Sequence, residues 1–143
     1  MRYLLPFTLL LSLLLTACGG KNFDESAIPP EQLSTELAFK RMAEHGELEP
    51  VVDAGLMIDG WQFHVGSTKE GSYLGSEKVK TVYLSDRSGI DYFVTSKTSP
   101  GIIDKLELGT YGFARGRVHA VERDLAAGEM EVELLLSGWT ERK

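Results

Sequence analysis

The sequence predicts a mainly β fold, a small five-stranded barrel preceded by a signal peptide, a flexible tether and one N-terminal helix. From Val51 onward, short runs rich in β-branched and aromatic residues are separated by glycine-containing turns. The run Met130–Leu136 alternates apolar and charged residues, as a half-buried strand does. Before these runs, Glu31–His45 has the composition and the end signals of a helix. These three observations place the barrel in residues 51–139.

Residues 1–17 have the three parts of a secretory signal. Met1–Arg2 is short and positive, Leu4–Leu15 is mostly apolar, and Thr16–Ala17 are small. The alternative is a transmembrane helix, which needs about 20 apolar residues to cross the hydrocarbon core. The apolar run ends at Gly19–Lys21, well short of that length. We therefore expect the leader to be cleaved.

The end of the leader, Leu15-Thr16-Ala17-Cys18, resembles a bacterial lipobox. The single cysteine of the chain falls at the residue that is lipidated in such lipoproteins. The resemblance implies acylation of Cys18 and a durable lipid anchor in the cell envelope. Because Gly19 follows and not Asp, it also implies the outer membrane, with the domain facing the periplasm. The alternatives are the outer face of the cytoplasmic membrane, or a plain signal peptide with an incidental cysteine.

The chain is acidic, with 15 basic and 21 acidic residues and a net charge of −6. Loss of Arg2 with the leader makes the balance −7. Most of this charge lies in residues 18–60, which carry three basic and nine acidic side chains. An acidic protein is a poor partner for phosphate backbones or anionic lipid, so nucleic acid is not the expected ligand.

Residues 18–30 are small and polar and end in two prolines, which predicts a lipidated flexible tether. Residues 31–46 predict a helix, in which Glu36 and Lys40 have the spacing of an ion pair and Gly46 is the stop signal. The apolar residues of this helix do not form one clean stripe. We therefore expect it to pack loosely on the domain, with docking to a partner as the alternative.

The barrel segment divides into five expected strands. Asp86–Gly89 is a hairpin turn signal, with Gly89 placed for positive φ, and a helical turn is expected within Ile102–Leu108. Flexible loops are expected at Gly66–Lys78 and Glu122–Gly128, and a bulge at Gly60. The expected strands are Gly55–Val65, Val79–Ser85, Ile90–Thr95, Thr110–Val121 and Met130–Leu136.

This order of a long strand, a hairpin, a helical connector and two further strands resembles an OB-fold. The stretch VYLSDRSGIDYFV is similar to the second and third OB strands, and LELGTYGFARGRV to the fourth with its mid-strand glycine. The resemblance covers most of the chain after the leader. An SH3-like or other small barrel is the alternative. A closed barrel leaves no exposed sheet edges, which suits a domain without disulfides.

Ligands of OB-folds bind on the face of the second and third strands, between the loops that join strands one to two and four to five. The resemblance therefore implies that aromatic rings on this face stack on bases or sugar rings. The alternative is that these rings fill the barrel core. The aromatic candidates are Trp61, Phe63, Tyr73, Tyr83, Tyr92 and Phe93.

Basic residues form a second candidate surface. Arg115, Arg117 and His119 alternate along the fourth strand and share one face unless Gly116 bulges. They could bind an anion, or they could be an ordinary solvated strand face that pairs with acidic residues of the fifth strand. The basic residues that could join them are Lys78, Lys80 and Arg87.

The sequence contains no motif for a metal site, a nucleophilic triad or a phosphate-binding loop, and no cofactor is expected. We therefore expect a non-catalytic binding module, whose partner is another envelope protein. One alternative is binding of single-stranded nucleic acid or an oligosaccharide on the barrel face. A second is an unrecognised hydrolase, which would require a histidine or paired carboxylates of perturbed pKa in a cleft.

Overall fold

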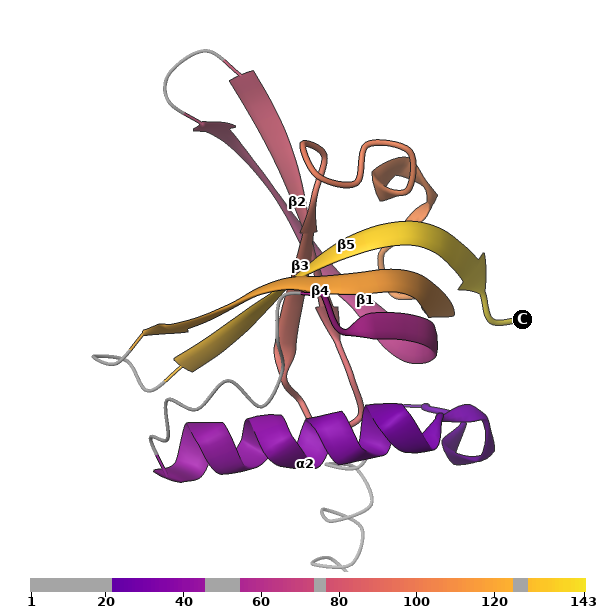
Figure 1. Ribbon diagram of the computed structural model, residues 1–143. Helices are drawn as coiled ribbons and strands as arrows, with labels where there is room; N and C mark the ends of the chain where they lie inside the picture. Colours follow the sequence, from indigo (N-terminus) through magenta and orange to yellow (C-terminus); the bar gives the residue numbers. More distant parts are fainter. Residues whose placement is uncertain (1–21, 46–54, 74–76, 125–128) are drawn as a thin grey trace, which may run out of the picture.

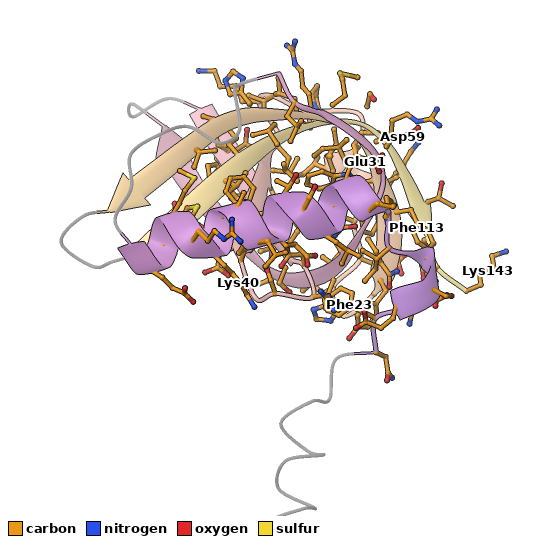
Figure 2. All side chains as sticks on the ribbon, turned by 60° about the horizontal axis from the view of Figure 1, so that its bottom comes forward. Phe23, Glu31, Lys40, Asp59, Phe113 and Lys143 are labelled. Carbon is orange, nitrogen blue, oxygen red and sulfur yellow. The ribbon has the colours of Figure 1, made fainter. Side chains whose placement is uncertain are left out.

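The computed structural model describes residues 22–45, 55–73, 77–124 and 129–143, and its centre is a closed barrel of five strands (Figure 1). The strands are β1 (Met57–Tyr73), β2 (Glu77–Ser85), β3 (Asp91–Thr95), β4 (Tyr111–Asp124) and β5 (Glu129–Glu141). The helices are η1 (Glu25–Ala27), α2 (Pro30–His45) and η2 (Ile103–Lys105). Of these, α2 lies across one end of the barrel, as Figure 2 shows from the helix side.

The strand order around the barrel is β1-β2-β3-β5-β4, and β4 closes it by pairing with β1. Neighbouring strands are antiparallel except β3 and β5, which run parallel. The long β1 makes closure possible, because its first half pairs with β4 and its second half with β2. The predicted fold, a mainly β protein with a small five-stranded OB-like barrel after one N-terminal helix, is confirmed.

Glycine-associated bulges bend the strands into the barrel. The register of β1 against β4 shifts between Asp59 and Trp61, where Gly60 has a φ of +71°. The register of β4 against β5 shifts between Arg115 and Gly116. A bulge adds local twist and redirects the side chains beside it, so these two shifts decide which way the residues around them point.

The second half of β1 corrects one expectation, because the loop expected at Gly66–Lys78 is mostly strand. Residues 66–73 continue β1, and residues 67–73 pair with β2 from Glu77 to Tyr83. Figure 1 shows this ribbon projecting from the barrel on the side opposite α2. The side chains from Gly66 to Gly71 are all exposed, so no buried face imposes a two-residue alternation on the sequence.

The strands β4 and β5 are also longer than expected. They pair out to Asp124 and Glu129, so residues 122–124 of the loop expected at Glu122–Gly128 belong to β4, and β5 continues to Glu141. Residues 125–128 lie outside the described residues.

The predicted hairpin turn at Asp86–Gly89 is present between β2 and β3. The Gly89 N–H donates to the Asp86 carbonyl at 3.2 Å, and Gly89 has a φ of +83°. The Asp86 carboxylate accepts from the backbone N–H of Ser88 at 2.9 Å. Glycine at the left-handed position and an aspartate that bonds two residues ahead are the chemistry of a tight turn.

The buried face of α2 is made of Gln32, Glu36, Phe39 and Met42, spaced at roughly one helical turn. Phe39 and Met42 belong to the barrel core, and the Phe39 ring lies 6.3 Å from the ring of Tyr92 in an edge-on geometry. The expectation of a loosely packed helix is therefore wrong. Glu36 faces the barrel and contacts Arg87 at 3.5 Å, in place of the expected pairing with Lys40.

Residues 22–29 belong to the stretch expected as a tether, and they lie against the barrel. The Asn22 N–H donates to the Tyr111 hydroxyl at 2.9 Å, and the Phe23 ring meets the Tyr111 ring edge-on at 5.1 Å. Asp24 exchanges two hydrogen bonds with the Gln62 side chain, at 2.7 and 3.0 Å. Ile28 is buried. The remainder of the expected tether, 18–21, lies outside the described residues.

At Gly112 the barrel wall depends directly on the absence of a side chain. A Cβ added there would lie 2.4 Å from Cζ2 of Trp139 and 2.8 Å from the Thr140 carbonyl oxygen. We therefore expect Gly112→Ala to lower the free energy of unfolding by about 1–3 kcal/mol through overpacking. Urea unfolding followed by tryptophan fluorescence measures this change. Gly101→Ala, where a Cβ meets nothing within 4 Å, is the control; equal stability of the two variants would contradict the packing argument.

Candidate functional site

The aromatic candidates divide between the core and the outer face of the barrel. Trp61 and Tyr92 are 1% and 0% exposed, and Phe63 is also buried, so all three are core residues and correct the expectation that they line a ligand face. Tyr83 and Phe93 are half-buried, are paired across β2 and β3, and have ring centroids 6.4 Å apart. Strand alternation explains the division, because Tyr92 and Phe93 necessarily point to opposite faces.

Tyr73 ends β1 in the projecting ribbon. Its side chain lies outside the described residues, so the structure does not place its ring relative to the outer face. Among the aromatic candidates, Tyr83 and Phe93 are the pair that the structure places on the outer face of β2 and β3.

The basic candidates do not form one surface. Arg115 and Arg117 are exposed on β4, next to the first half of β1, whereas Lys78 and Lys80 pair with its second half. Arg87 lies in the turn beside α2. Arg115, Arg117 and His119 are all exposed along β4, and Lys78, Lys80 and Arg87 do not join them.

Arg115 lines a shallow groove at the bulge of β1. Its Nε lies 3.2 Å from Oδ1 of Asp59, and both side chains are more than two-thirds exposed. The groove has a volume of about 330 Å³ and is also lined by Phe113, Trp139 and Gly60. Figure 2 labels Asp59 and Phe113 at the same side of the barrel. Because the ion pair balances its own charge and is solvated, it adds little stability and no strong anion site.

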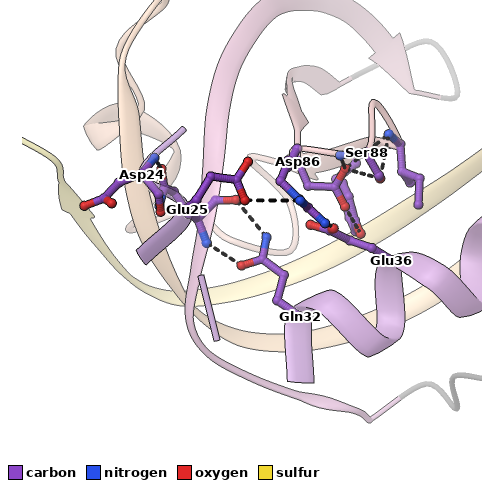
Figure 3. A network of polar contacts seen from close by, with 10 residues as sticks. Asp24, Glu25, Gln32, Glu36, Asp86 and Ser88 are labelled. Atoms are coloured by element: carbon purple, nitrogen blue, oxygen red, sulfur yellow. Dashed lines mark hydrogen bonds and ion pairs between the residues drawn. The ribbon is translucent and has the colours of Figure 1, made fainter. Parts of the chain in front are cut away.

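A polar network lies between α2 and the β2–β3 turn (Figure 3). The Tyr92 hydroxyl donates to Oδ2 of Asp86 at 2.8 Å, and Oδ1 accepts from the Ser88 hydroxyl and from the Ser88 and Ile90 N–H groups. Asp86 is fully buried, and burial raises its pKa although these hydrogen bonds oppose the rise. The network holds the turn in place below the helix.

Glu36 brings a second carboxyl to this network from α2. It is 2% exposed; its Oε2 contacts Arg87, and its Oε1 is buried without a hydrogen-bond partner in the described structure. Burial raises the pKa of Glu36 to about 7, the Asp86 carboxyl adds to the rise, and Arg87 opposes it. Arg87 also contacts Glu25 of η1 at 3.1 Å. Arg87 therefore connects the β2–β3 turn with both η1 and α2.

Glu36 and Asp86 are paired carboxyls of raised pKa, which is part of what the hydrolase alternative requires. Raised carboxyl pKa values also arise in structural ion-pair networks, so they do not identify a catalytic site by themselves. Neither Glu36 nor Asp86 lines the groove at Asp59 or the second groove of the barrel, beside α2. Within the described residues, no cluster of His, Cys, Asp and Glu has the arrangement of a metal site.

Two glutamines connect the N-terminal segment, α2 and β1. The Gln32 side-chain amide donates to the Gln62 carbonyl at 2.9 Å and accepts from the Gln62 N–H at 2.8 Å, as a neighbouring strand would. The Gln62 side chain in turn holds the backbone of Asp24 and accepts from Arg142 at 2.9 Å. No sequence motif marks this pair, because each glutamine acts through a residue distant in the chain.

Comparisons of the chain with protein-family models, curated proteins and solved structures find no significant match. Inference about function therefore depends on the residues of this chain alone.

The Glu36 network predicts that stability depends on pH. The folded state holds a proton on Glu36 up to about pH 7, whereas the unfolded chain releases it near 4.5. The free energy of unfolding therefore falls as pH rises through this window and stays low above it. We expect Glu36→Gln to remove much of this slope and to be more stable than the wild type at pH 8, by up to about 3 kcal/mol.

Urea unfolding at intervals from pH 4 to 8 measures both slopes. Glu44→Gln, an exposed acid on the same helix, is the control and should keep the wild-type slope. An unchanged slope in Glu36→Gln would show that Glu36 does not titrate in this window.

Proposed function

We propose that this protein is a lipid-anchored envelope lipoprotein whose barrel is a non-catalytic binding module for another envelope protein. Cys18, the proposed acylation site, lies outside the described residues, and its assignment depends on the sequence Leu15–Cys18. In the part of the chain that the structure describes, no helix is long and apolar enough to cross a membrane. The proposed location is the outer membrane with the barrel facing the periplasm; the alternative is the outer face of the cytoplasmic membrane.

The contacts of Asn22 and Phe23 support a close association with the membrane surface. These residues are attached to Tyr111 on the barrel, and Cys18 precedes Asn22 by only four residues. At about 3.6 Å per extended residue, four residues reach at most about 14 Å. An acylated Cys18 would therefore hold the barrel next to the lipid headgroups, where membrane-assembled partners are found.

The burial of Trp61 and Tyr92 is the observation that favours a protein partner over a polymer. A surface for nucleic acid or oligosaccharide combines several exposed rings with basic side chains in one groove. Here Trp61 and Tyr92 lie in the core, and Tyr83 and Phe93 lie apart from the groove that Arg115 lines. The two rings that line this groove, Phe113 and Trp139, are half-buried. The net charge of −6 also opposes binding to a phosphate backbone.

Anchoring strengthens weak contacts. A module fixed at the membrane meets a membrane-bound partner at a high effective concentration, so a small groove can supply enough affinity. The barrel therefore needs no deep pocket to act as an adaptor.

The lipid anchor is tested by Cys18→Ser. We expect this variant to remain an unprocessed precursor and to incorporate no labelled palmitate, because the acyl acceptor is missing. Metabolic labelling and membrane fractionation measure the result. Ser12→Ala, which leaves Leu15–Cys18 intact, is the control. Normal cleavage and acylation of Cys18→Ser would overturn the lipoprotein assignment.

The partner class is tested by crosslinking and affinity purification from whole envelopes. The acylated protein is expected to recover a discrete protein, and Cys18→Ser should recover much less of it because the effective concentration falls. Recovery of glycan or nucleic acid that salt releases, without a protein, would instead favour the polymer-binding alternative.

A further inference from the structure

The second groove of the barrel lies between the C-terminal half of α2, the β2–β3 turn and the start of β5. It has a volume of about 280 Å³. Three of its lining residues, Lys40, Ala43 and Glu44, belong to α2, which forms one wall of the groove. Its lining residues are Lys40, Ala43, Glu44, Ser88, Gly89, Ile90, Asp91 and Met130.

The floor of this groove is apolar and continuous with the core. Met130 is 9% exposed and belongs to the core cluster, and the half-buried Ile90 packs against that cluster. Ala43 adds a small side chain on the α2 side, which leaves the floor accessible. An aliphatic side chain placed over Ile90 and Met130 would extend the barrel core and remove further apolar surface from water.

The rim of the groove is predominantly acidic. Glu44 and Asp91 line it, and Glu131 lies directly across from Asp91 in the β3–β5 register. All three side chains are exposed, and none has an ion pair within the described residues. Lys40 is the one cation among the lining residues, so the rim keeps a negative charge that complements a basic partner.

We propose that this groove docks a segment of the envelope partner that carries an aliphatic side chain beside a lysine or arginine. The aliphatic side chain would occupy the floor at Ile90 and Met130. The cationic side chain would pair with the carboxylates of Glu44, Asp91 and Glu131. This assignment rests on the proposed function, since it identifies the surface through which the module contacts its protein partner.

Photo-crosslinking in cells tests the groove. The full acylated chain carries p-benzoylphenylalanine in place of Ala43, which lines the groove, or in place of Leu37, which is 57% exposed on the same helix and does not line it. We expect a discrete crosslinked protein from position 43 and none from position 37. Mass spectrometry should locate the crosslink in a partner peptide that contains a basic and an aliphatic residue.

Charge reversal at the rim is a second test of the groove, and an equal charge change elsewhere is its control. Glu44→Lys combined with Asp91→Lys should reduce the crosslink at position 43 by about tenfold, as expected for two interfacial charges. Glu31→Lys combined with Asp104→Lys changes the net charge equally, at exposed residues outside the groove, and should leave the yield unchanged. Circular dichroism confirms that both double variants fold.

The outcomes of these experiments test the groove assignment separately from the proposed function. A crosslink at position 37 and not at 43, no crosslink at 43, or equal losses in the two double variants would overturn the groove assignment and leave a protein partner possible at another surface. Absence of any protein from the envelope purification described above would overturn the proposed function itself.

Discussion

The structure depends on the packing of α2 across one end of the barrel. Phe39 and Met42 complete the core from this helix, and Gln32 provides the backbone of Gln62 with the two hydrogen bonds that a neighbouring strand would otherwise make. Glu36 reaches the β2–β3 turn through Arg87. The helix is therefore a structural part of the barrel, because its removal would expose core side chains and leave buried backbone groups without partners.

The strands could be predicted from local signals in the sequence, whereas the interface between α2 and the barrel could not. The turn at Asp86–Gly89 and the alternation in Met130–Leu136 are local signals, and both correspond to observed structure. The buried face of α2 includes Gln32 and Glu36, two polar residues at positions where an apolar stripe would be expected. Their partners are distant in the chain, so no local pattern could reveal that this face is buried.

Whether an aromatic side chain points into the core or outward depends on the register of its strand, which the sequence alone does not give. In β3, Tyr92 points into the core and Phe93 points outward, and a shift of one residue would exchange them. Arg115 meets Asp59 only because the strands pair in a register that shifts beside both residues. The sequence could therefore supply candidate residues for the site, whereas the pairing of strands decided which of them reach solvent.

The helix also relates the proposed anchor to the proposed docking groove. Residues that precede α2 attach the chain to Tyr111 and Gln62, near the segment that would carry the lipid, whereas Lys40, Ala43 and Glu44 form the groove wall in its C-terminal half. Sixteen helical residues span about 24 Å, so the two features are separated along a rigid element. Glu36 lies between them, and a change in its charge acts on the contact that holds this wall of the groove against the barrel. The position of a partner relative to the membrane would then be fixed by the same buried contacts that hold α2 against the barrel.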